Sequence, residues 1–147
     1  DLEKIIVEYI IANNMLYPNS PPVDGYVTRG VVRDNDIVIH AGLDIASKMK
    51  NEIRSPLSGI VVSALDGEFG KTIILHHQND FFTIYGYLDT MLVEARDLID
   101  KGQLIGQVGK DSHANGPHLY FEVWKGNQII DPRELISTYK EKDVSIR

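Results

Sequence analysis

Short runs of β-branched and aromatic residues follow one another from Tyr26 to Trp124, and turn-forming residues separate them. Runs of this length and composition predict strands. The intervening stretches DND, DGEFG, QND and KGN supply Asp, Asn and Gly, which accept the positive φ values of tight turns. We therefore expect a mainly β structure built on an antiparallel sheet. The predicted strands are YVTRGVV (26–32), IVIHAGLDI (37–45), GIVVSALD (59–66), KTIILHH (71–77), FFTIYGYL (81–88), LIGQVG (104–109) and HLYFEVW (118–124).

Two further segments, one at each end of the chain, have the pattern of helices. In residues 1–16 the apolar side chains recur at helical spacing, although the many β-branched residues also suit a strand. The stretch YPNSPPVDG (17–25) then has the composition of a connector. Near the other end, IDPRELISTY (130–139) predicts a short helix that Asp131 caps, with Pro132 in its first turn.

These patterns divide the chain into an N-terminal extension with its connector (1–21), a main domain (22–138) and a C-terminal tail (139–147). The length of 147 residues suits one domain with its own core. The chain begins at Asp1 and shows no signal-peptide pattern, so we interpret it as a mature form or an excised part of a longer protein.

Composition excludes several classes of function. The net charge of −6 argues against a nucleic-acid partner. The chain has no cysteine, so it has neither disulfides nor thiolate metal sites, and a metal ion would need His, Asp or Glu ligands. No stretch approaches the roughly 18 apolar residues of a membrane span, so we expect no membrane insertion by this segment.

His40 and Asp44 lie four residues apart in IHAGLDI, with Gly42 between them. A tight bend at Gly42 would direct both side chains to one point, and zinc binds imidazole nitrogen and carboxylate oxygen alike. The pattern H-x-x-x-D is common by chance, so an ordinary surface turn is the competing explanation.

Two other pairs lie on predicted strands, where residues two apart share a face. His118 therefore shares a face with Tyr120, and Tyr85 shares one with Tyr87. A lone strand histidine is more often structural than functional, and an ordinary aromatic-rich strand would explain the tyrosines.

Taken in order, these segments resemble the lysostaphin-type, or LytM-type, zinc endopeptidase domain, whose family cuts peptide cross-links in peptidoglycan. VDGYVTRGV resembles the first strand, IHAGLDIA the H-x-G-x-D-I-A motif, and SPLSGIVVSA the small-residue turn and strand. FFTIYGYL resembles a segment that ends Tyr-Gly-His-Leu, NGPHLYFEV one that ends Gly-Pro-His-Leu-His-Phe-Glu, and IIDPREL the closing Asp-Pro turn. The resemblance implies the family's antiparallel duplicated-hybrid-motif fold, with short helices at the ends.

The resemblance also implies roles for individual residues. His40 and Asp44 match two zinc ligands, and His118 matches a catalytic histidine. The chain departs from the pattern at two positions. Tyr120 stands where the third zinc ligand belongs, and Tyr87 stands where a second catalytic histidine belongs.

These two tyrosines predict a degenerate site with no bound cofactor. Catalytic zinc normally has three protein ligands and an open position for water. Tyrosine binds zinc well only as phenolate, and ionising a phenol of pKa near 10 costs about 4 kcal/mol at pH 7. We hypothesise that the phenols of Tyr87 and Tyr120 replace the ion by hydrogen-bonding Asp44 and the imidazoles.

We expect a binding, regulatory or scaffolding module in cell-wall metabolism, because degenerate members of the family activate cell-wall hydrolases or scaffold envelope complexes. The implied partners are an envelope protein, peptidoglycan or both. The implied location is the cell envelope, either periplasmic or membrane-anchored outside the cytoplasm. Tyr85 would join the other tyrosines in lining the former substrate groove.

Three alternatives stay open. The first is an active zinc endopeptidase with a His-Asp-Tyr ligand set. The second is a substitute third ligand, from His76 or His77 at a strand end or from His113 in a loop. The third is a biotinyl- or lipoyl-type carrier, but its modifiable lysine should lie between the two matching segments, and the KMK at 48–50 precedes both.

Overall fold

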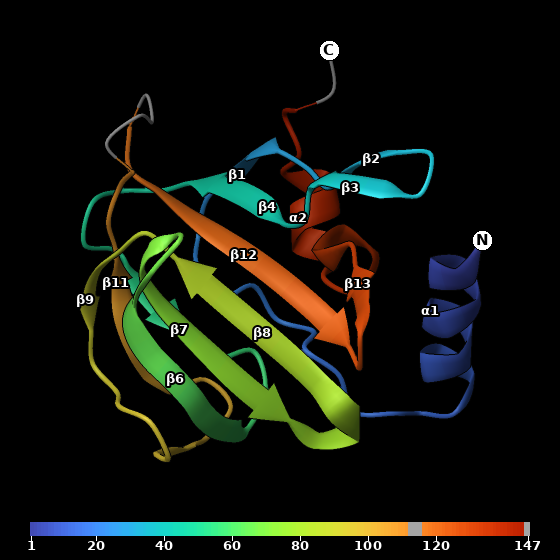
Figure 1. Cartoon of the computed structure of the whole chain (residues 1–147), viewed down its shortest axis with the longest axis horizontal. Coiled ribbons are helices and arrows are strands. Elements are labelled where there is room, and N and C mark those ends of the chain that lie inside the picture. Colours follow the sequence, from blue (N-terminus) through green and yellow to red (C-terminus); the bar gives the residue numbers. More distant parts are fainter. Residues whose placement is uncertain (112–115, 146–147) are drawn as a thin grey trace.

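The computed structural model describes residues 1–111 and 116–145, and its main feature is a twisted antiparallel sheet (Figure 1). The mainly antiparallel β class expected from the sequence is confirmed. In spatial order the sheet contains β1 (Tyr26–Arg29), β4 (Leu43–Ala46), β12 (His118–Lys125), β8 (Phe81–Gly86), β7 (Gly70–His77), β6 (Gly59–Gly67) and β10 (Leu98–Ile99), while β13 (Gln128–Ile130) pairs with β12.

Two smaller sheets and four helical segments complete the described structure. One sheet has the order β5 (Glu52–Arg54), β11 (Leu104–Val108) and β9 (Leu88–Met91), and the other is a ribbon of β2 (Val32–Asp34) and β3 (Ile37–His40). The helical segments are α1 (Leu2–Ala12), the 3₁₀ turns η1 (Gln78–Asp80) and η2 (Pro132–Glu134), and α2 (Ser137–Glu141).

Three of the predicted strands are each divided in two by a bend. The runs 26–32, 37–45 and 81–88 become β1 and β2, β3 and β4, and β8 and β9. At the second bend, a Cβ on Gly42 would lie 2.3 Å from the carbonyl oxygen of Phe121, so only glycine allows this approach. The bends transfer the chain from one sheet to another, and the site lies beside two of them.

Strand β12 places most of the site. It lies between β4 and β8, so both of its edges are hydrogen-bonded. Leu119 and Phe121 are fully buried on one face, as the alternation of side chains along a strand requires. On the other face Tyr120 lies opposite Asp44 of β4 and Gly86 of β8.

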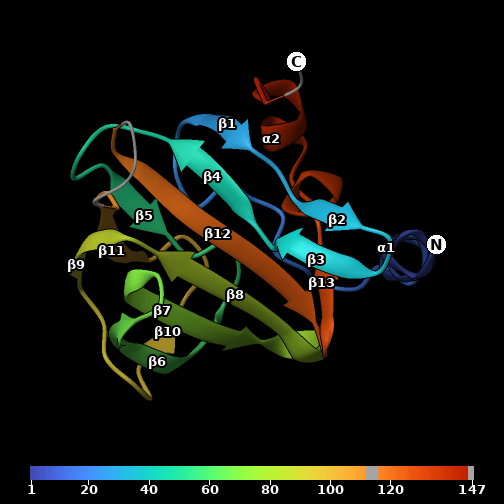
Figure 2. The ribbon, with the colours of Figure 1, turned by 45° about the horizontal axis from the view of Figure 1, so that its top comes forward.

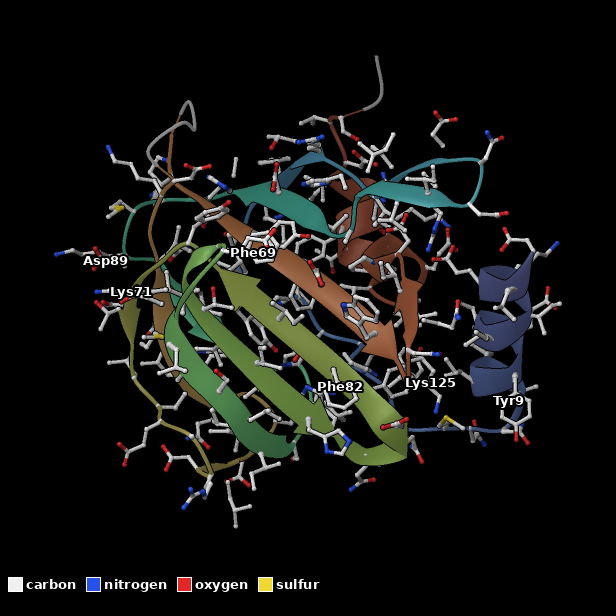
Figure 3. All side chains as sticks on the ribbon, viewed as in Figure 1. Tyr9, Phe69, Lys71, Phe82, Asp89 and Lys125 are labelled. Atoms are coloured by element: carbon white, nitrogen blue, oxygen red, sulfur yellow. The ribbon has the colours of Figure 1, made fainter. Side chains whose placement is uncertain are left out.

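Helix α1 packs onto this sheet structure and belongs to the same core. Asp1 caps it by accepting hydrogen bonds from the backbone N–H groups of Glu3 and Lys4. Val7 and Ile10 join the main cluster of buried apolar residues, while Tyr9 points outward (Figure 3). The helix predicted in residues 1–16 is therefore confirmed over Leu2–Ala12. No described helix is long and apolar enough to cross a membrane.

The ribbon of β2 and β3 lies beside the start of α1 (Figure 2). Arg33 on β2 pairs with Glu3 of the helix at 3.5 Å. The other carboxylate contact of Glu3 is to the backbone N–H of Asp131, at 2.7 Å. The first turn of α1 is thus connected to the ribbon and to the C-terminal segment.

The C-terminal segment is more ordered than a tail. The predicted helix forms as η2 followed by α2, with Asp131 capping η2 as expected. Tyr139, at which we placed the start of the tail, is fully buried and donates a hydrogen bond to the carbonyl oxygen of Val23 at 2.6 Å. Further along, Asp143 pairs with Arg133 at 2.6 Å. Residues 139 to 143, which we assigned to the tail, therefore contact the main domain.

Candidate functional site

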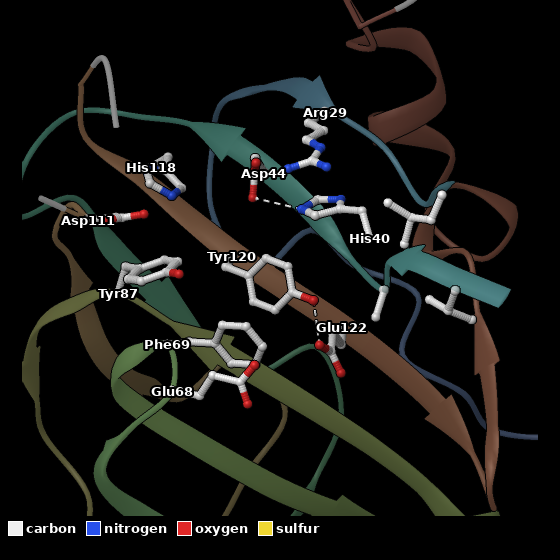
Figure 4. Close-up of a pocket in the computed structure, with 13 residues that line it drawn as sticks. Arg29, His40, Asp44, Glu68, Phe69, Tyr87, Asp111, His118, Tyr120 and Glu122 are labelled. Atoms are coloured by element: carbon white, nitrogen blue, oxygen red, sulfur yellow. Dashed lines mark hydrogen bonds and ion pairs between the residues drawn. The ribbon is translucent and has the colours of Figure 1, made fainter. Parts of the chain in front are cut away.

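A pocket of about 330 Å³ opens on the sheet face that carries Tyr120 (Figure 4). Its walls come from β1, the β3–β4 bend, the β6–β7 turn, the β8–β9 junction and β12. It is lined by the charged residues Arg29, Asp44, Glu68, Asp111 and Glu122, the imidazoles of His40 and His118, the rings of Phe69, Tyr87 and Tyr120, and the aliphatic Val38, Ile39 and Ala41. Five of the six predicted site residues meet here.

His40 and Asp44 face one another across the bend at Gly42. The Nδ1 atom of His40 lies 2.8 Å from the carbonyl oxygen of Gly30, and a carbonyl can only accept, so Nδ1 carries the hydrogen. The Nε2 atom then faces Asp44 Oδ1 at 3.4 Å. The bend therefore orients both groups toward one point.

This pair keeps the spacing of two zinc ligands. In a tetrahedral site with bonds of about 2.0–2.1 Å, two ligand atoms lie about 3.3–3.4 Å apart. The separation of His40 Nε2 and Asp44 Oδ1 matches that value, and an ion pair with protonated His40 would match it equally. These two positions fit a zinc ion.

Tyr120 does not fit a zinc ion. Its hydroxyl donates a short hydrogen bond to Glu122 Oε2, and the indole of Trp124 donates to Glu122 Oε1 at 2.7 Å. Burial raises the pKa of Tyr120, and its hydrogen bond to the Glu122 carboxylate raises this pKa further, so the phenol stays neutral. The hypothesis that Tyr120 hydrogen-bonds Asp44 is wrong, because the Tyr120 hydroxyl donates its single proton to Glu122.

Tyr87 lies where β8 gives way to β9. It has a φ of 60°, which is uncommon for a bulky residue, and its N–H donates to the carbonyl oxygen of Phe69 at 2.7 Å. Its ring centroid lies 5.2 Å from that of His118. Burial raises the pKa of Tyr87, and the charges of Asp111, Asp44 and Glu68 raise this pKa further.

Tyr85 is not a groove residue. It is fully buried, and its hydroxyl lies 2.6 Å from Thr83 Oγ1 within the core. The expectation that Tyr85 and Tyr87 share a face assumed a continuous strand. The positive φ of Tyr87 breaks the alternation and turns that side chain into the pocket instead.

The substitute ligands do not reach the pocket where the structure describes them. His77 is buried, with Nδ1 donating to the carbonyl oxygen of Ser58 at 2.9 Å and Nε2 accepting from Thr83 at 2.7 Å. His76 stacks on Phe82 with ring centroids 4.4 Å apart. His113 lies outside the described residues. Within residues 1–111 and 116–145, no three His, Asp or Glu side chains are placed to hold one metal ion.

Several pocket residues were missed by the sequence analysis. Glu122 follows Tyr120 by two positions on β12, so the strand period alone would have placed it on the same face. Phe69 and Glu68 come from the β6–β7 turn, and nothing local in DGEFG shows that this turn folds over the site. Arg29 reaches the pocket from β1, which is distant in sequence.

Residues 38–132 match the sequence profile described as Peptidase family M23, and this match covers more than half of the chain. The chain belongs to peptidase family M23. The geometry above is therefore that of an M23 domain, in which His40, Asp44 and Tyr120 lie where the resemblance to the family predicts the three zinc ligands.

Known relatives of this M23 domain are larger proteins. It is 31% identical over 107 residues to stage II sporulation protein Q of Bacillus subtilis (strain 168), a match that covers 69% of this chain and 38% of that protein. A zinc containing peptidase from Vibrio cholerae superposes with a TM-score of 0.69 at 30% identity, covering 77% of this chain and 38% of that one. The chain thus spans well under two thirds of either relative.

A third likeness concerns the fold alone. The structure of the SpoIIQ–SpoIIIAH pore forming complex matches with a TM-score of 0.69 at 24% identity, covering 80% of this chain and 90% of that one. Together these likenesses confirm the expected lysostaphin-like, LytM-like fold for the M23 domain.

Proposed function

We propose that this M23 domain is a catalytically degenerate binding module of the bacterial cell envelope, with a regulatory or scaffolding role in cell-wall metabolism. One observation carries the proposal. The hydroxyl of Tyr120, at the third ligand position, donates to Glu122 and is held neutral there. Within residues 1–111 and 116–145 the domain then lacks the three ligands that catalytic zinc requires.

The energetics favour this arrangement over a zinc site. To bind zinc, Tyr120 would have to ionise, which costs about 4 kcal/mol at pH 7 even at a reference pKa of 10. The raised pKa of this phenol adds to that cost. Ionisation would also remove one of the two hydrogen bonds that Glu122 accepts, and Glu122 is only 4% exposed.

The second departure removes a proton acceptor. A phenol with a raised pKa cannot serve as a general base near pH 7, so Tyr87 does not replace the missing catalytic histidine. His118 is left beside the Tyr87 ring, with Nδ1 3.3 Å from the carbonyl oxygen of Gly116. Peptide hydrolysis would need both a bound zinc ion and a base. Tyr120 replaces one of the expected zinc ligands, and Tyr87 replaces one of the expected catalytic histidines.

The descriptions of similar proteins support a protein partner for this module. The Vibrio cholerae relative is described as a zinc containing peptidase, and SpoIIQ is described in a pore forming complex with SpoIIIAH. By analogy we propose an extracytoplasmic location, with an envelope protein, peptidoglycan or both as partners.

A zinc endopeptidase with an altered ligand set is the second candidate. It is favoured by the spacing of His40 Nε2 and Asp44 Oδ1, which suits two ligands of one ion. In that case zinc would polarise the peptide carbonyl and activate water, with His40 and Asp44 holding it.

Zinc stoichiometry separates the two candidates. The protein is equilibrated with micromolar zinc, dialysed and analysed for zinc per chain, beside Tyr120→His and Tyr120→Phe variants. We expect zinc near zero for the natural chain and for Tyr120→Phe, and near one for Tyr120→His. A ratio near one in the natural chain, together with cell-wall digestion, would overturn the proposal.

A further inference from the structure

Three aromatic rings form a corner at one end of the pocket (Figure 4). Phe69 and Tyr120 stack against each other with centroids 4.5 Å apart and planes tilted by 34°. Tyr87 stands steeply to both, at 6.1 Å and 81° from Phe69 and at 6.4 Å and 66° from Tyr120. The ring of Tyr87 therefore forms one wall of the corner, and the Phe69–Tyr120 pair forms the other.

The charges around this corner are mostly negative. Among the described lining residues, Asp44, Glu68, Asp111 and Glu122 carry carboxylates and Arg29 carries a guanidinium, and the Glu122 carboxylate already accepts hydrogen bonds from Tyr120 and Trp124. Figure 4 shows Arg29 on the far side of Asp44 from the rings, while Asp111 and Glu68 flank the Tyr87–Phe69 end.

The electrostatics of Tyr87 report the sign of the local potential. After burial, the charges of Asp111, Asp44 and Glu68 are what raise the pKa of its phenol. A potential that opposes a negative phenolate favours a positive charge at the same place. The aromatic rings and the negative potential therefore both favour a positively charged ligand.

We propose that this corner binds the primary ammonium group of a peptide side chain. The proposal rests on the proposed function, because it takes the pocket to be a binding site with no zinc ion in it. An ammonium at the corner would be close to aromatic rings, and cation–π attraction acts within about 6 Å of a ring centroid. The carboxylate of Glu68 would balance its charge.

Other ligand classes fit less well. An anionic group would face the carboxylates of Asp44, Glu68 and Asp111, and within residues 1–111 and 116–145 the lining offers it one guanidinium, that of Arg29. A neutral sugar could stack on Phe69 or Tyr87 but would gain nothing from the charges. The cavity of about 330 Å³ is at the small end of ligand sites, which suits one side chain with its adjoining peptide groups.

The direct test compares a free amine with its neutral form. The probes are the N-terminally acetylated stem-type peptide Ac-L-Ala-γ-D-Glu-L-Lys, an all-L peptide Ac-Ala-Lys-Ala-amide, and the Nε-acetyl derivative of each. Dissociation constants are measured by NMR titration of the natural chain at low and high salt. We expect at least one free-amine peptide to bind about tenfold tighter than its acetylated form, which is one decade in affinity. That preference should shrink at high salt.

The two peptides distinguish the source of the amine. Amine-dependent binding of the stem-type peptide alone indicates a cell-wall ligand, and equal binding of the all-L peptide indicates a protein lysine. Acetylated peptides that bind as tightly as the free amines in both series would overturn the proposal.

Matched variants locate the site. Glu68→Gln and Tyr87→Leu should each reduce the preference for the free amine, while Glu94→Gln, an exposed carboxylate outside the pocket, should leave it unchanged. Arg29→Gln should strengthen amine binding, because it removes the opposing charge. An unchanged preference in all three pocket variants would contradict the assignment to this corner.

Failure of this inference is separable from failure of the proposed function. If the natural chain binds one zinc ion and digests cell walls, the proposed function fails whatever the peptides do. If it holds no zinc and shows no preference for the amine, only the ammonium site fails.

Discussion

At the scale of single residues, the hydroxyl of Tyr120 has the largest consequence for this domain. The resemblance to the family predicts a third zinc ligand at this position, but the proton of the Tyr120 hydroxyl goes to a buried carboxylate of the same strand. Glu122 in turn accepts from Tyr120 and Trp124, so its charge is compensated by two donors. The tyrosine thus fills a structural role at a position where the family places a metal ligand.

This role predicts a loss of stability on truncation of the hydroxyl. Tyr120→Phe removes one of the two donors to a buried carboxylate, so we expect the free energy of unfolding to fall by about 1.5–3 kcal/mol. Denaturant unfolding of both chains at pH 7 measures this difference in the free energy of unfolding. Tyr9→Phe, at a tyrosine that is 60% exposed, should stay within about 0.5 kcal/mol of the natural chain. Equal effects of the two substitutions would contradict the role assigned to Tyr120.

At the scale of elements, two segments that looked peripheral belong to the core. Helix α1 contributes Val7 and Ile10 to the main apolar cluster, and α2 contributes Tyr139. Helices near both ends of the chain therefore contribute side chains to the core of the domain.

Helix α1 offers a matched pair for testing this. Ile10 is fully buried and Ile5 is 61% exposed on the same helix. We expect Ile10→Ala to lower the free energy of unfolding by about 2–5 kcal/mol. Ile5→Ala should change it by less than about 0.5 kcal/mol. If both substitutions are neutral, α1 is an independent extension, as the division at residue 21 implied.

At the scale of the whole molecule, burial of phenols sets the response to alkali. Tyr85, Tyr120 and Tyr139 each have a pKa raised chiefly by burial. In the unfolded chain a tyrosine loses its proton near pH 10, while these three keep theirs in the folded state. Above pH 10 the unfolded state therefore binds fewer protons, and the free energy of unfolding falls as pH rises. Below pH 10 both states are protonated, and this contribution is constant.

We expect the free energy of unfolding to fall by about 2 kcal/mol per pH unit at pH 10 and by nearly 4 kcal/mol per pH unit at pH 11, because each of the three groups approaches about 1.4 kcal/mol per unit as the unfolded phenols ionise. Urea unfolding between pH 9 and pH 11 measures this slope. Tyr139→Phe should reduce the slope by about a third, whereas Tyr26→Phe, at a 55% exposed residue, should not. An unchanged slope in Tyr139→Phe would show that its phenol is not held neutral.

Much of the fold was predictable because it depends on short-range patterns. Alternating side chains and turn residues located the longer strands but not the short β5, β10 and β13, and the caps at Asp1 and Asp131 correspond to the predicted helices. The bends inside three of those runs were not predictable, since they depend on close approaches such as that of Gly42 to Phe121.

The sequence by itself determined the class of the domain, its family and the meeting of His40 with Asp44, because these depend on local motifs in a fixed order. Only the tertiary structure decided where the tyrosines point. Tyr85 and Tyr87 are parted by a positive φ, and Tyr120 turns to a carboxylate whose buried charge needs a donor. The direction of each side chain depends on neighbours from β4, the β6–β7 turn and β12. These elements are distant in sequence, so a local sequence pattern does not show that they meet.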